Sequence, residues 1–152
     1  MPVYEEKQKF NAFWMSILNG FVILATLYTV YQLWGQEVDW IHFLAPFVAI
    51  VSIVLISSVT LVTKIDRDVL SVGFQPFGKR IIQRSEIAKA YVRQYSPLGE
   101  YGGWGYRTGR NGKAYNTMGD QGLQLELTDG SRVLVGTQQP RELERVVRDW
   151  LQ

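Results

Sequence analysis

Two long uncharged stretches constrain this 152-residue chain more than any other feature. Residues 13–34 and 40–63 contain no Asp, Glu, Lys or Arg, and only the short link 35–39 separates them. At a rise of about 1.5 Å per residue, each stretch can cross a hydrocarbon core of roughly 30 Å as an α-helix. The sequence therefore predicts a transmembrane helical hairpin with spans at 13–34 and 41–63. A cleaved signal peptide is disfavoured, because its apolar region is usually shorter and less closely followed by a second one.

The charges that flank these stretches predict their orientation. The link carries Glu37 and Asp39 but no Lys or Arg, whereas two lysines precede the first stretch and Lys64 and Arg67 follow the second. The positive-inside rule counts Lys and Arg, so both termini are expected on the cytoplasmic side. We therefore expect a multi-pass membrane protein with an N-terminal membrane segment, 1–63, and a cytoplasmic domain, 64–152.

From residue 64 onward the helical apolar pattern gives way to short alternating runs bounded by Gly and Pro, which is typical of β-strands. Strands are expected around residue 65 to 74 and over 79–84, 87–95, 102–107, 114–118, 123–127 and 133–135. A two-residue or a three-residue loop can join the last two strands. The three-residue loop, 128–130, is preferred because it sets Val133 and Val135 on the face of Leu125 and Leu123 and gives Gly130 the left-handed position.

The chain is expected to end in an amphipathic helix. Pro140 suits the first position of a helix, and charged residues cover the face opposite the apolar stripe. The stripe consists of Leu143, Val146, Val147, Trp150 and Leu151. Because a small sheet needs a cover for its apolar side, we expect this stripe to pack on the strands.

Short strands closed by one helix describe a pleckstrin-homology-like (PH-like) barrel, and several motifs support a family resemblance. These motifs are Lys64-Ile65-Asp66, Phe74-x-Pro76-Phe77-Gly78, Tyr95-Ser96-Pro97, residues 102–107 (GGWGYR), Ala114-Tyr115-Asn116, residues 122–125 (GLQL), and Asp129-Gly130 through residues 136–140 (GTQQP). In these motifs the chain resembles bacterial PH-like membrane proteins, whose layout is a membrane hairpin followed by a PH-like domain. The resemblance implies an α+β membrane protein of the bacterial inner membrane, with a seven-stranded antiparallel β-barrel or sandwich capped by the C-terminal amphipathic helix. It implies no catalytic residues and no cofactor.

Composition argues against several kinds of chemistry. The chain has no Cys and a single His, so it offers no thiolate nucleophile, no Ser-His-Asp set and no ordinary metal-ligand set. The Gly-rich stretch before Gly112-Lys113 does not match a phosphate-binding loop, because Arg107 and Ala114 stand where glycine and Ser or Thr are needed. We therefore expect no enzyme, and the mild excess of 14 Lys and Arg over 10 Asp and Glu after residue 63 does not by itself indicate nucleic acid.

The favoured function is a membrane-anchored interaction or scaffold module, which presents its β domain to a protein partner or to copies of itself. Aromatic and glycine residues are concentrated around 101–106, which is unusual for a loop that only connects strands. An equally weighted alternative is that Trp104 and Tyr106 fill the core. The candidate interaction surface is Tyr101, Trp104, Tyr106, Arg107, Arg110 and Lys113.

The alternative function is recognition of anionic lipid headgroups by basic residues of the domain. The residues proposed for it are Lys64, Arg67, Lys79, Arg80 and Arg84, with Arg107, Arg110 and Lys113 as a second group. The competing interpretation is ordinary solvated charge. Because a tethered domain reaches the membrane without lipid affinity, protein binding is the expected role.

Overall fold

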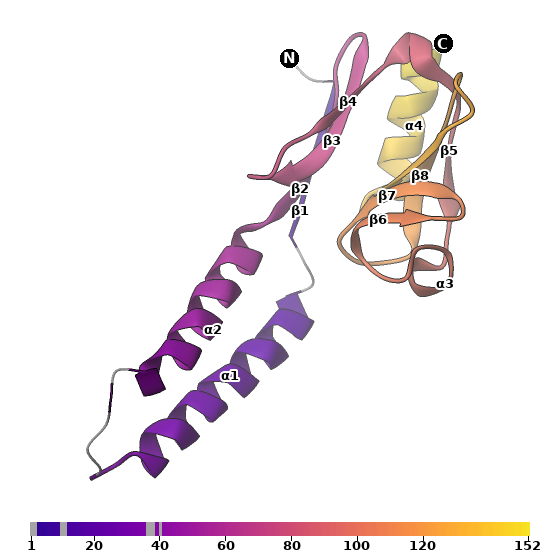
Figure 1. Cartoon of the computed structure of the whole chain (residues 1–152). Coiled ribbons are helices and arrows are strands. Elements are labelled where there is room, and N and C mark those ends of the chain that lie inside the picture. Colours follow the sequence, from indigo (N-terminus) through magenta and orange to yellow (C-terminus); the bar gives the residue numbers. More distant parts are fainter. Residues whose placement is uncertain (1–2, 10–11, 36–38, 40) are drawn as a thin grey trace. The chain divides into compact units, whose positions relative to one another are not determined.

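The computed structural model describes residues 3–9, 12–35, 39 and 41–152, and Figure 1 shows the course of the chain. The chain divides into two compact units. The β unit comprises Met1–Lys9 together with Thr60–Gln152, and the helical unit is Phe10–Val59. The β unit is therefore built from chain on both sides of the helices.

The helical unit contains α1 (Ala12–Gln32) and α2 (Ile41–Ser58). In the described part of the chain, α2 is the one helix that is long and apolar enough to cross a membrane. Within α1 (Ala12–Gln32), the described stretch Ile17–Gln32 is a shorter apolar helix and is not one of the candidate spans. The expected two-helix transmembrane hairpin is therefore not shown. Trp40 and the acidic Glu37 of the expected link lie outside the described residues.

The strands of the β unit form two sheets in the described residues. The first sheet has the order β1-β2-β3-β4, and all of its neighbours are antiparallel. The second has the order β5-β8-β9-β7-β6, in which β7 and β9 run parallel. The strands are β1 (Tyr4–Lys9), β2 (Thr60–Ile65), β3 (Val69–Gln75), β4 (Arg80–Gln83), β5 (Ile87–Gln94), β6 (Gly105–Gly109), β7 (Gly112–Asn116), β8 (Gln121–Leu127) and β9 (Arg132–Gly136). The 3₁₀ turn η1 (Arg84–Glu86) and the helices α3 (Pro97–Tyr101) and α4 (Pro140–Leu151) complete the unit.

This architecture corrects the predicted fold class. The described residues form an α+β, β-rich fold of four- and five-stranded sheets, with no closed barrel among them. The expected seven-stranded antiparallel PH-like barrel is wrong in strand number, in closure and in the parallel β7–β9 pair. The sequence pattern missed β1 and β2. Thr60–Ile65 is largely buried and continues the apolar run of α2, so its change from helix to strand leaves no polar alternation to detect.

β1 escaped detection because its buried face is polar. Tyr4, Glu6 and Gln8 are buried while the residues between them are exposed. Glu6 accepts hydrogen bonds from the Tyr4 hydroxyl (2.7 Å), from Thr137 Oγ1 (2.8 Å) and from the Gln138 backbone N–H (2.7 Å). These bonds satisfy the buried carboxylate and join the first sheet to the segment that follows β9.

The last hairpin and the last helix agree with the sequence expectation. Leu125 pairs with Val133 and Leu123 with Val135, and Gly130 adopts φ 82°, which confirms the three-residue loop. α4 packs against β5 and β8 and buries Leu143, Val147 and Trp150, which confirms its role as a cover for the sheet.

Candidate functional site

An open depression of about 630 Å³ lies where three segments of the β unit meet. One is the start of β4, one is the β6–β7 turn and one is the β8–β9 turn. Its lining residues are Arg80, Thr108, Gly109, Arg110, Asn111, Gly112, Lys113, Asp129, Gly130, Ser131 and Arg132. We call this feature the basic depression.

The parallel pairing of β7 with β9 brings the two turns together. Lys113 pairs with Val133, so the start of β7 lies beside Arg132 at the start of β9. Gly112 allows this close approach, because a Cβ atom there would lie 2.2 Å from the Arg132 carbonyl oxygen. Its φ of 98° is also a conformation that favours glycine. A larger residue at position 112 would push the two turns apart.

Positive charge dominates the lining of the basic depression. Arg80, Arg110, Lys113 and Arg132 line it, and Asp129 is the one carboxylate among the lining residues. The Ser131 side chain and the Ser131 backbone N–H, which donates to Asp129 Oδ1 at 2.8 Å, lower the pKa of Asp129. Arg80 contributes further to this lowering. Asp129 is therefore charged at neutral pH, and the formal charge of the lining is about +3 by these five side chains.

Arg80 connects the depression to a cluster of aromatic rings. The Tyr115 ring lies 5.0 Å from the Tyr106 ring and 6.5 Å from the Phe74 ring, measured between centroids. Burial raises the pKa of the Tyr115 hydroxyl, the neighbouring Tyr106 adds to the rise, and nearby Arg80 opposes it. Arg80 therefore lines the depression and also acts on the Tyr115 hydroxyl.

An ion pair in which the two charges compensate each other borders the depression and supports its β6–β7 turn. Arg93 Nη2 lies 2.7 Å from Glu100 Oε2, and the hydrogen bonds from Arg93 lower the pKa of Glu100 to about 2. Asn111 Nδ2 donates to the same carboxylate oxygen at 2.9 Å. The charge of Arg93 is therefore compensated by Glu100. Arg132 lines the small concavity around Arg93, Glu100 and Asn111 as well as the basic depression.

The structure separates the expected aromatic surface into buried and exposed members. Tyr101 is buried beside Tyr95, Ala114 and Leu134, so it belongs to the core. Trp104 is 37% exposed and donates its Nε1–H to the Gly119 carbonyl, and Tyr106 is 52% exposed. The exposed Arg107 donates from Nε to the Trp104 carbonyl.

The structure also redistributes the expected basic residues. It unites Arg80 from one predicted group with Arg110 and Lys113 from the other, and it adds Arg132, which sequence reasoning missed. Lys64 instead pairs with Glu5 at 3.2 Å. The other three, Arg67, Lys79 and Arg84, are not among the lining residues of the depression. No sequence signal pointed to Arg132, because its position depends on the parallel strand pair.

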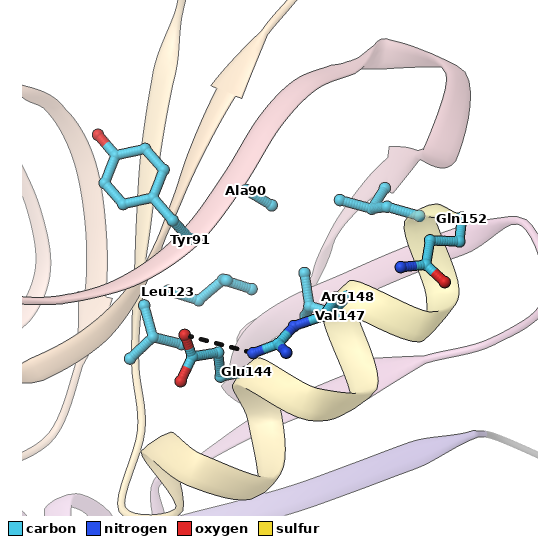
Figure 2. A pocket seen from close by; sticks show the side chains of 9 residues that line it. Ala90, Tyr91, Leu123, Glu144, Val147, Arg148 and Gln152 are labelled. Carbon is cyan, nitrogen blue, oxygen red and sulfur yellow. Dashed lines mark ion pairs between the residues drawn. The ribbon is translucent and has the colours of Figure 1, made fainter.

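A second concavity lies between α4 and strands β5 and β8 of the five-stranded sheet. It measures about 300 Å³, and its walls include Ala90, Leu123 and Val147. Figure 2 shows these side chains together with the Glu144–Arg148 ion pair of α4, whose Arg148 Nη2 and Glu144 Oε1 atoms are 3.8 Å apart. Its walls are mostly apolar and the charges that line it compensate each other, so it gives less basis for a ligand than the basic depression.

Comparison with known proteins adds no function to this geometry. No protein-family model matches the chain, and a search of curated proteins finds no match. The resemblance to bacterial PH-like membrane proteins therefore stays a prediction. Among the described residues, no group of three or more His, Asp or Glu side chains is placed to hold a metal ion.

Proposed function

We propose that the β unit binds a phosphate-bearing anion in the basic depression and that the helical unit attaches it to a membrane. The observation that carries the proposal is the convergence of Arg80, Arg110, Lys113 and Arg132 on one concavity. Three of the four are arginines, whose planar guanidinium groups match pairs of phosphate oxygens. Like charges gathered around one concavity repel each other, and an anion would relieve that repulsion.

The openness of the depression limits the strength of binding. Two unit charges 4 Å apart in water attract by about 1 kcal/mol, and this rises toward about 4 kcal/mol at a protein surface. Because several cations act together against one competing carboxylate, we expect a dissociation constant of roughly 10 µM to 1 mM. The interaction is exposed, so added salt should weaken it.

The chemistry of the helices supports attachment to a membrane. Their large apolar side chains are exposed in the isolated chain, as with Phe21 at 71% and Leu55 at 62%. Several of their hydroxyl groups bond within the same helix: Thr26 donates to the Val22 carbonyl, and Ser52 donates to the Val48 carbonyl. Such bonds remove the cost of placing a hydroxyl in hydrocarbon, where no water is present to pair with it.

The strand pairing supports placement of the β unit on one side of that membrane. Lys9, which precedes α1, pairs with Thr60, which follows α2. The helical unit therefore leaves and rejoins the β unit at one place. Both ends of the helical unit are thus joined through the chain to neighbouring strands of the first sheet.

Titration of the full chain in micelles of an uncharged detergent tests the anion site. One titrant is inorganic pyrophosphate and the other is phosphatidylglycerol in mixed micelles, so that a free phosphate is distinguished from a lipid headgroup. Arg110→Ala combined with Lys113→Ala should weaken binding at least tenfold, or about 1.4 kcal/mol. The matched control, Arg141→Ala with Arg145→Ala, removes the same charge from the exposed face of α4 and should change binding less than twofold.

Equal weakening in the two double variants would contradict the site, since it would show an effect of net charge alone. Failure of both titrants to bind at low salt would contradict the proposal altogether. Binding of phosphatidylglycerol without pyrophosphate would assign the site to lipid headgroups. Binding of both titrants would assign it to the phosphate group itself.

A protein-binding role is the second candidate, and the exposure of Tyr106 and Trp104 favours it. Both side chains lie on or next to β6, which is an edge strand of the five-stranded sheet. Aromatic side chains at a sheet edge are suited to pairing with an extended segment of another protein. Tyr106→Ala should then abolish capture of a partner from detergent-solubilised membranes while the anion titrations stay unchanged. Recovery of the chain alone, as a monomer, would count against this role.

A further inference from the structure

The turn between β3 and β4 exposes an aromatic side chain that the anion site does not use. Phe77 is 78% exposed, and Pro76, Gly78 and Lys79 around it are also exposed. An aromatic ring held in water over most of its surface is unfavourable, by about 25 cal/mol for each Å² of apolar area. A partner surface that takes up the ring would recover that free energy.

Strand register fixes where this turn lies in the β unit. Gln75, the last residue of β3, pairs with Thr60, and Thr60 pairs with Lys9 on its other side. Neighbouring strands are about 4.8 Å apart, so Gln75 lies within about 10 Å of both residues. α2 ends at Ser58, two residues before Thr60. The turn therefore stands at the end of the sheet where the chain passes into and out of the helical unit.

Backbone packing holds the turn in place against β3. The Gly78 N–H donates to the Phe74 carbonyl at 3.1 Å. A Cβ atom at Gly73 would lie 2.1 Å from the Gly78 carbonyl oxygen and 2.5 Å from Lys79 Cα, so only glycine permits this approach. The exposed Phe77 is thus carried by a turn that is packed on the sheet.

We propose that the β3–β4 turn, with Phe77 and Lys79, contacts the headgroup layer of the membrane that the helical unit enters. This inference rests on the proposed membrane attachment. Aromatic rings favour the interface between headgroups and hydrocarbon, and an adjacent lysine attracts anionic phosphate groups. The headgroup layer extends roughly 5–8 Å beyond the hydrocarbon on each side. Gln75, at the start of the turn, pairs with Thr60, which is only two residues from the end of α2, so the chain connection is short enough for the turn to reach that layer.

The absence of cysteine from the sequence allows a direct test with single labels. Phe77→Cys in the full chain is labelled with an environment-sensitive fluorophore and reconstituted, at about one chain per vesicle, into phosphatidylcholine and phosphatidylglycerol vesicles. Lipids that carry a nitroxide at a shallow position serve as the quencher. The control is Asp68→Cys in the turn that follows β2. This turn lies at the Ile65 end of β2, whereas the β3–β4 turn lies at the Thr60 end, and these two ends are about 17 Å apart at 3.3 Å per residue. We expect quenching at position 77 to exceed quenching at position 68 at least threefold.

A third label separates failure of this inference from failure of the membrane attachment. Val54→Cys in α2 should be quenched by lipids that carry the nitroxide deep in the acyl chain. If the label at position 54 is quenched but the labels at positions 77 and 68 are quenched equally or not at all, the proposed contact of the turn is wrong and the membrane attachment stands. No quenching at 54 would overturn both. The fluorescence of the label at position 77 could instead change as more chains are added per vesicle, without quenching by the nitroxide lipids. That result would show that the turn contacts a second copy of the chain, and it would overturn the proposal.

Discussion

The two units of this chain use apolar side chains in opposite ways. In the β unit most of them are shielded, and Leu61, Leu125 and Leu134 have no exposed surface, although Phe77 and a few others remain exposed. In the helical unit they face outward, and Phe21, Leu24 and Tyr31 are each more than half exposed. The β unit therefore gains its stability from its own core, whereas the helical unit needs lipid or another apolar partner to cover it. Polar groups follow the same division, since β1 buries a carboxylate among donors from other segments and the helices satisfy hydroxyls internally.

A matched pair of leucine truncations gives the largest expected contrast. Leu125→Ala removes a fully buried side chain and should lower the free energy of unfolding of the β unit by about 2–5 kcal/mol. Leu24→Ala, at a site that is 67% exposed, should change it by less than about 0.5 kcal/mol. Chemical denaturation in detergent, followed by circular dichroism, measures both. Similar losses in the two variants would remove the contrast between the units.

Truncation of the buried carboxylate tests how the β unit holds its N-terminal strand. Glu6→Ala leaves the Tyr4 hydroxyl and the Thr137 hydroxyl without their buried acceptor, so we expect a loss of about 2–3 kcal/mol. Its control is Glu5→Ala on the exposed face of β1, where only surface ion pairs with Lys7 and Lys64 are removed. The control should change stability little. A Glu6 variant as stable as the control would show that β1 contributes little to the β unit.

The Arg93–Glu100 pair should make the stability of the β unit depend on pH. Because folding lowers the pKa of Glu100 from 4.5 to about 2, the pair stabilises the folded state above about pH 4.5 and this contribution is lost as the pH falls toward 2. Glu100→Gln should cost about 1 kcal/mol at neutral pH, allowing for screening by solvent, and nothing near pH 2. Denaturation curves across this range measure the difference. A difference independent of pH would contradict the role of the charge.

The smallest expected effect lies in the helical unit. Ser52→Ala removes a hydroxyl whose hydrogen bond goes to its own helix, at the Val48 carbonyl, so the free energy of unfolding should change by less than about 0.5 kcal/mol. The same denaturation assay measures it. A loss above about 1 kcal/mol would indicate that Ser52 also contacts a second helix or a second chain.

The sequence allowed prediction where local pattern and tertiary structure agree. The β8–β9 hairpin was predicted in register because Leu123 and Leu125 alternate with polar residues and Gly130 fits the left-handed turn position. β1 was not predicted, because its buried residues include Glu6 and Gln8, which hydrophobic periodicity counts as surface. The length of the second apolar stretch was misjudged for the converse reason. Thr60–Ile65 extends the apolar run of α2 although it is a strand.

The candidate site was predicted in part. Arg80 was expected in one basic group, and Arg110 and Lys113 were expected in another, and the structure places all three around one depression. What joins them is the non-local order of the second sheet, in which β7 lies between β6 and β9. Neither that order nor the parallel pairing that adds Arg132 leaves a mark on local sequence. The sequence therefore allowed prediction that basic residues form the site, but not which of them lie together around the depression.

The pairing of Lys9 with Thr60 has a consequence for the architecture of the gene product. For the first sheet, the whole segment Phe10–Val59 occupies the position of a loop in a β-hairpin. An insertion at such a position can lengthen, shorten or be exchanged without a shift in strand register, because the ends that it joins stay adjacent. It also sets an order of assembly during synthesis, since β1 must wait for its partner until both helices have been made. β1 is thus the first strand to be made, and it can pair only after β2 has followed the two helices.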